Sequence, residues 1–95
     1  MMDIHQFFED HNDEFLKFDR VTDKTSQRPD IHAFRLLDRL VPGNSDMVSA
    51  AEHDEIYLDV DVDAVVAAAT EAQLIELIRC GVRHDDEFES FCMFV

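Results

Sequence analysis

The chain has 95 residues, of which 46% are hydrophobic, and only two are glycine and two proline. A chain of this length forms one domain, its composition argues against disorder, and the lack of any run of about 18 apolar residues argues against a membrane span. Its 22 acidic and 8 basic residues give a net charge of −14, which disfavours direct binding to nucleic acid or anionic lipid.

The charge divides the single compact domain, residues 1–95, into two parts. Residues 1–45 hold nine acidic and six basic residues, and their patterns are mainly helical. Residues 46–95 hold thirteen acidic residues and only two basic ones, and they include strand patterns. We therefore expect a helical part followed by an acidic α/β part.

The opening of the chain and its two cysteines indicate a cellular location. Residues 1–15 are acidic and amphipathic, unlike the basic and apolar start of a signal peptide. Cys80 and Cys92 are therefore expected to be free thiols in a reducing compartment, and we predict a cytoplasmic protein.

Residues 4–18 show the clearest helical pattern in the chain. Apolar side chains and one histidine recur there at spacings of three and four, which places them on one face of a helix: Ile4, Phe7, Phe8, His11, Phe15 and Phe18. Asp3 is the predicted N-cap, and His11 is predicted to lie at the core or its rim.

A polar connector over residues 20–29 separates this helix from a second one over about 31–41. Asp30 is expected to cap the second helix, and Pro42-Gly43 to end it. Apolar residues cover more than half of its circumference, and His32 falls on the remaining polar arc. Such a helix is either central or shared with a second subunit.

The second part mixes strands and helices. Alternation over residues 55–60 predicts a strand, and a helix up to residue 69 is expected to begin at Asp61 or Asp63. Thr70 and Gln73 form a capping box that opens a further helix, and Gly81 is expected to end it.

The last segment, residues 82–95, predicts a short strand, an acidic turn at 85–87 and a terminal strand over about 89–95. Both faces of the terminal strand are apolar, so it is expected to be central or covered on both sides. Residues 47–51 fit either a loop or an edge strand.

These patterns together predict an α+β fold. An N-terminal helical hairpin would pack on a small, mainly antiparallel sheet of about three strands, with one or two further helices.

Three alternating aspartates, Asp59, Asp61 and Asp63, raise the question of a calcium loop. Such a loop needs glycine at its sixth position and glutamate at its twelfth, whereas this segment has Ala64 and Thr70 there. A solvated strand end followed by a helix cap is the better interpretation, and no metal ligand is assigned.

Other kinds of active site find little support. The histidines and cysteines show no zinc-ligand spacing, Cys92 lies in an apolar strand where a thiol is inert, and two glycines cannot build a phosphate loop. The exception is a pair of local groups, His53 and His84, each followed by two carboxylates. If their strands adjoin, these groups would support a metal-dependent enzyme, which we keep as one alternative.

The charge favours a non-enzymatic protein that acts by protein–protein interaction and needs no cofactor. Its partner would present a basic surface, in the sharper form a nucleic-acid-binding protein inhibited by a nucleic-acid-mimicking decoy of phage type. The residues expected to form this acidic surface are Asp54, Glu55, Asp59, Asp61, Asp63, Asp85, Asp86, Glu87 and Glu89.

A second alternative is a homo-oligomeric assembly module, such as a homodimer. The second helix and the terminal strand carry more apolar area than a small core needs. The residues expected at this interface are Phe34, Leu37, Val41, Phe91 and Phe94.

Overall fold

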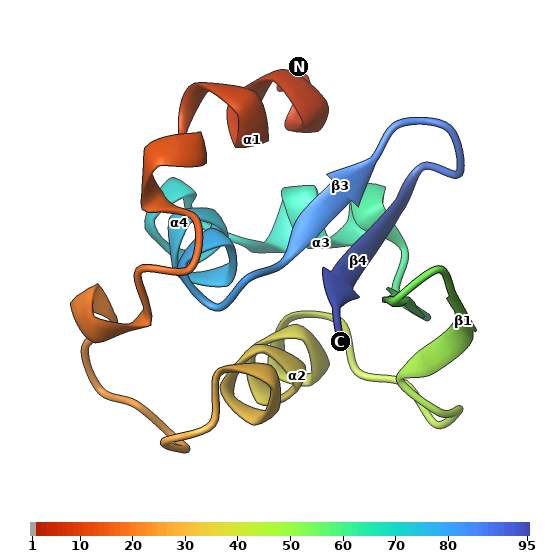
Figure 1. Ribbon diagram of the computed structural model, residues 1–95, viewed down its shortest axis with the longest axis horizontal. Coiled ribbons are helices and arrows are strands. Elements are labelled where there is room, and N and C mark those ends of the chain that lie inside the picture. Colours follow the sequence, from red (N-terminus) through yellow and green to blue (C-terminus); the bar gives the residue numbers. More distant parts are fainter. Residues whose placement is uncertain (1) are drawn as a thin grey trace.

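The computed structural model describes residues 2–95 as a four-stranded antiparallel sheet with four α-helices beside it (Figure 1). The strands follow the order β1-β2-β4-β3. Their bounds are β1 Val48–Glu52, β2 Glu55–Leu58, β3 Arg83–Asp85 and β4 Ser90–Phe94. The predicted α+β class is confirmed. The expected number of strands is corrected from about three to four, because residues 48–52 form an edge strand.

Strand β4 is central, which is one of the two arrangements that its apolar faces predict. It pairs with β2 on one side and with β3 on the other. Phe91 and Met93 point into the core and are buried, and Cys92 on the opposite face is also buried. The end of the strand departs from the prediction, since the side chain of Phe94 is 57% exposed.

The helices begin where the sequence places their caps, with one exception. Their bounds are α1 Ile4–Asp10, α2 Pro29–Leu40, α3 Val62–Ala68 and α4 Glu71–Arg79. Asp3 caps α1, Asp61 caps α3, and the Thr70–Gln73 capping box opens α4. The expected cap of α2 at Asp30 is wrong. Pro29 occupies the first helical turn, which moves the N-cap to Arg28.

The first helix is shorter than its apolar stripe predicts. Helix α1 ends at Asp10, and two short 3₁₀ helices follow, η1 Asn12–Glu14 and η2 Phe18–Arg20. Between them, Leu16 has a φ of 62°, in the left-handed region that interrupts a helix. Asn12 and Asp13 are also poor interior helix residues because their side chains compete for backbone groups.

The predicted N-terminal hairpin of helices does not form. Helix α1 packs against β3, whereas α2 packs against α3 and α4. Figure 1 shows α1 and α2 at opposite ends of the molecule, with α4 between them. The apolar sides of all four helices and the inner face of the sheet share one core, in which the rings of Phe8 and Phe91 stack at 5.7 Å.

Gly81 ends α4 and lets the segment after α1 come close. Its φ of 98° is favourable only for glycine, and a Cβ at this position would lie 2.8 Å from Cδ2 of Leu16. None of the helices within residues 2–95 has the length and apolar character needed to cross a lipid bilayer.

Candidate functional site: an acidic pocket with two facing histidines

Three segments that are distant in the sequence surround one acidic pocket. They are the start of α1, the junction between β2 and α3, and the turn between β3 and β4. The pocket has a volume of about 330 Å³. Its polar lining consists of Asp3, His5, Asp61, Asp63, His84, Asp86 and Glu89. Five carboxylates and two imidazoles therefore share one concave surface.

Local hydrogen bonds explain why the acidic segments are held at this rim. Oδ1 of Asp61 accepts a hydrogen bond from the backbone N–H of Asp63 at 3.0 Å, which fixes the start of α3. In the β3–β4 turn, Oδ1 of Asp85 accepts hydrogen bonds from the N–H groups of Glu87 and Phe88 at 2.9 and 3.0 Å. Asp85 thus holds the turn, and Asp86 in the same turn reaches the pocket.

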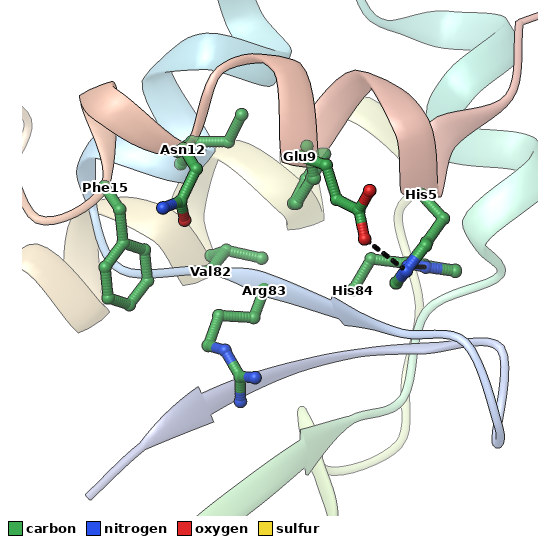
Figure 2. A pocket seen from close by; sticks show the side chains of 9 residues that line it. His5, Glu9, Asn12, Phe15, Val82, Arg83 and His84 are labelled. Atoms are coloured by element: carbon green, nitrogen blue, oxygen red, sulfur yellow. Dashed lines mark hydrogen bonds and ion pairs between the residues drawn. The ribbon is translucent and has the colours of Figure 1, made fainter.

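Two histidines face each other where α1 crosses β3. Nδ1 of His5 lies 3.1 Å from Nδ1 of His84, and Nε2 of His5 lies 3.2 Å from Oε1 of Glu9 (Figure 2). Both imidazoles are half-buried. Glu9 is one turn after His5 on α1, so the helix itself aligns this carboxylate with the ring.

The contacts assign the tautomers of the two rings. A carboxylate only accepts hydrogen bonds, so the proton of neutral His5 is on Nε2, beside Glu9, and its Nδ1 carries a lone pair. Nδ1 of His84 then donates to Nδ1 of His5. Burial lowers the pKa of His84, and the nearby His5 lowers it further, while Asp86, Glu89 and Asp85 act in the opposite direction.

The histidine pair separates the acidic pocket from a second hollow. This neighbour has a volume of about 300 Å³ and lies between α1, the end of α4 and β3. Figure 2 shows Glu9, Asn12 and Arg83 around it, together with the two histidines. The imidazoles are therefore reached from two sides.

The nine residues predicted to form the acidic surface do not all gather there. Asp61, Asp63, Asp86 and Glu89 line the pocket, whereas Asp54 lies in the β1–β2 turn. The remaining four have other settings. Glu87 is exposed outside the pocket, Asp59 accepts a hydrogen bond from Ser45 at 2.5 Å, and Asp85 holds its turn.

Glu55, the ninth residue of the predicted acidic surface, forms an ion pair with an arginine. Its carboxylate pairs with the guanidinium of Arg83 across the sheet. The other arginine of the second part, Arg79, pairs instead with Glu14 of the first part at 3.1 Å. The pocket carboxylates are not among the partners of these arginines.

The residues predicted for an oligomer interface are divided between the core and the surface. Leu37 and Phe91 are fully buried within this chain, so neither offers surface to a second copy. Phe34 and Val41 are partly buried against the core. Phe94 is exposed, and the guanidinium of Arg83 lies 4.5 Å from the centre of its ring.

The condition for the enzyme alternative, that the strands of His53 and His84 adjoin, is not met. His53 lies in the β1–β2 turn, and β2 and β4 stand between β1 and β3. Its side chain is 85% exposed and contacts Glu52 at 3.1 Å. The partner of His84 is His5, which the sequence did not single out because the two lie 79 positions apart.

The predicted position of a second histidine, His32, is also wrong. His32 is buried rather than on the polar arc of its helix, with 2% of its surface exposed. Its Nδ1 accepts a hydrogen bond from the backbone N–H of Thr25 at 3.1 Å, and its Nε2 donates to Glu76 at 2.5 Å. Both ring nitrogens are used, and they join the connector, α2 and α4.

The two cysteines are free thiols, and their burial makes them poor nucleophiles. Burial raises the pKa of Cys80 to about 12 and that of Cys92 to about 11. The thiolate, which is the nucleophilic form, is therefore scarce at neutral pH. The expectation of an inert Cys92 agrees with this environment.

No protein-family model matches this chain, and neither the curated proteins nor the solved structures give a significant match to it. Its function is therefore inferred from the residues and their geometry.

Proposed function

We propose that this protein is a non-enzymatic interaction module that binds a basic surface of another protein through its acidic pocket. The observation that carries this proposal is the convergence of Asp3, Asp61, Asp63, Asp86 and Glu89 from three segments onto one concave surface. Among the described residues that line it, none is a lysine or an arginine. A partner would supply the missing positive charge.

The exposure of these carboxylates suits binding, although Asp3 and Asp61 also cap helices. All five are solvent-exposed, so they remain hydrated until a partner arrives. Arginine is the side chain best matched to such a surface, because its planar guanidinium forms two hydrogen bonds with one carboxylate. The field of the acidic half would also speed the encounter, over a screening length of about 8 Å at physiological salt.

The sharper form of the proposal is that the partner normally binds nucleic acid. Carboxylates on the β3–β4 turn and at the start of α3 would then occupy positions that phosphates take on the partner. This decoy version makes a distinct prediction, namely that the protein and duplex DNA compete for the same basic surface.

Two variants that remove equal charge test whether the pocket matters. The first is D61N/D63N/D86N/E89Q, which removes four of the five carboxylate charges of the pocket. Its D61N change preserves the start of α3, because asparagine caps a helix as well as aspartate does. The control is D30N/D38N/D46N/E71Q, at exposed positions outside the pocket. The probe is a short arginine-rich peptide, and fluorescence anisotropy measures its dissociation constant at several salt concentrations.

We expect the pocket variant to bind the peptide at least about tenfold more weakly, and the control to lose much less. Binding by the natural chain should weaken steeply with salt. Equal losses in the two variants would show that net charge alone attracts the peptide, and would overturn the pocket as the binding site. If the peptide is first bound to duplex DNA, release of DNA by the natural chain supports the decoy, and no release contradicts it.

A further inference from the structure

We propose that His5, His84 and Asp86 form a binding site for a divalent transition-metal ion of the zinc type. One potential ligand atom from each residue lies within 4.8 Å of the other two. Within residues 2–95 this is the one group of histidine, cysteine and acidic side chains with such a separation. The site does not depend on the proposed protein partner.

The distance between the imidazoles is close to that of two ligands on one ion. Zinc–nitrogen bonds of about 2.0–2.1 Å at tetrahedral angles separate two nitrogens by about 3.3 Å. Nδ1 of His5 and Nδ1 of His84 are 3.1 Å apart. The ring centroids are 5.3 Å apart, so the two Nδ1 atoms point almost directly at each other. Both rings would rotate so that their lone pairs converge on an ion beside the line joining the two nitrogens, and His84 would shift its proton to Nε2.

Glu9 provides the support that metal-bound histidines usually have. Its carboxylate accepts the Nε2–H of His5 at 3.2 Å, which leaves Nδ1 of that ring with its lone pair toward His84. A carboxylate behind a ligating histidine fixes the tautomer and raises the basicity of the ligand. His5 therefore has the tautomer of a ligand before any ion binds.

The two rings lie on packed elements of the fold, whereas the third ligand lies on an exposed turn. His84 lies on β3 and contacts the ring of Phe91, which stacks on Phe8 of α1. Asp86 is exposed on the β3–β4 turn, so its side chain can approach an ion held by the histidines. Three protein ligands leave a fourth tetrahedral position open to water or to another molecule.

The ligand types favour zinc over magnesium or calcium. Imidazole nitrogen suits zinc, cobalt, nickel and copper, whereas magnesium and calcium prefer sites made of oxygen alone. Asp61, Asp63 and Glu89 lie in the same pocket and would raise the local concentration of any cation. Selectivity for zinc must therefore come from the two histidines.

The test begins with the unmodified, metal-free protein. Zinc is added while histidine ring resonances are followed by NMR, and calorimetry gives the affinity and stoichiometry. We expect one zinc ion per chain, with the largest shifts at His5 and His84 and little change at His32 and His53. Magnesium and calcium at the same concentrations should leave both rings unchanged. Equal shifts at His53, or equal affinity for calcium, would overturn the assignment.

Single substitutions then assign the ligands. H5N and H84N should each weaken zinc binding by at least about tenfold, and D86N by less. H53N and D54N are the matched controls, because both residues lie in the exposed β1–β2 turn. Since His84 packs on Phe91, circular dichroism checks its variant for folding, and H5N decides the outcome if H84N unfolds. Unchanged affinity in H5N contradicts the site.

This experiment separates the metal site from the interaction proposal. The pocket variant D61N/D63N/D86N/E89Q removes one proposed ligand but keeps both histidines, whereas H5N leaves all pocket carboxylates in place. H5N should lose zinc binding and keep peptide binding, so zinc binding that persists in H5N overturns the metal site alone. Peptide binding that persists in the pocket variant overturns the interaction proposal alone.

Discussion

His32 and His5 both lie on helices of the first half of the chain and both contact a glutamate, yet they differ in how their ring nitrogens are used. Both nitrogens of His32 are satisfied, by Thr25 and Glu76, and the ring is buried. His5 is half-exposed, and its Nδ1 faces a second imidazole across 3.1 Å. In the proposed metal site, an ion would replace the second imidazole as the partner of this nitrogen.

Histidine therefore has a structural role at position 32 and a proposed ligand role at position 5. A buried histidine with two fixed partners stabilises the fold, because breaking either hydrogen bond leaves a buried polar group without a partner. A half-exposed histidine backed by a carboxylate holds a lone pair in a defined direction, which is what a ligand requires. The two histidines differ in burial and in whether both ring nitrogens have fixed hydrogen-bond partners. Their residue type and their position on a helix are the same.

The largest expected effect is the loss of stability when His32 is replaced. H32L removes both hydrogen bonds and leaves Glu76 without its partner, so we expect the free energy of unfolding to fall by about 2–4 kcal/mol. H5L removes a half-exposed contact and should cost less than about 1 kcal/mol. Urea unfolding measures both. Equal losses would contradict the distinction drawn between the two histidines.

A slightly smaller effect should come from zinc. At a free zinc concentration about 100-fold above the dissociation constant, the natural chain should gain about 2.7 kcal/mol, and a chelator should reverse the gain. H32L should retain this increment although its starting stability is lower. Thermal unfolding with and without zinc measures it, and a gain that persists in H5N would place the ion elsewhere.

The smallest expected effect is the loss of folding stability in acid when Glu14 is protonated. Hydrogen bonds from Arg79 and Arg20 lower the pKa of Glu14 from 4.5 to about 2. A lowered pKa means that the carboxylate stabilises the fold above pH 4.5 and loses this effect as the pH falls toward 2. E14Q should therefore be less stable than the natural chain at neutral pH, with the difference disappearing between these values.

The control for the acid effect is E87Q, because Glu87 is exposed on the β3–β4 turn. Its stability should follow that of the natural chain at every pH. Denaturant unfolding at a series of pH values measures both variants. A difference for E14Q that stays constant down to about pH 2 would show that the ion pair with Arg79 is not its cause.

Local features of this protein were predictable from its sequence. Helix caps depend on one side chain and the backbone N–H groups next to it. The caps at Asp3 and Thr70 form as expected, and Asp61 is the one of the two candidates, Asp61 and Asp63, that caps α3. The two apolar faces of β4 predicted a strand that is central or covered on both sides, and it is central. Net charge and its concentration in the second half are properties of composition alone.

The tertiary structure decided which side chains meet. His84 has His5 as its partner, rather than His53, because α1 packs on β3 while β2 and β4 separate the two hairpin ends. His32 lies on the predicted polar side of α2, and it is buried because α4 covers that side. Short-range patterns report the surroundings of a residue within one or two turns, whereas a site assembled across 79 positions depends on how the helices pack against the sheet.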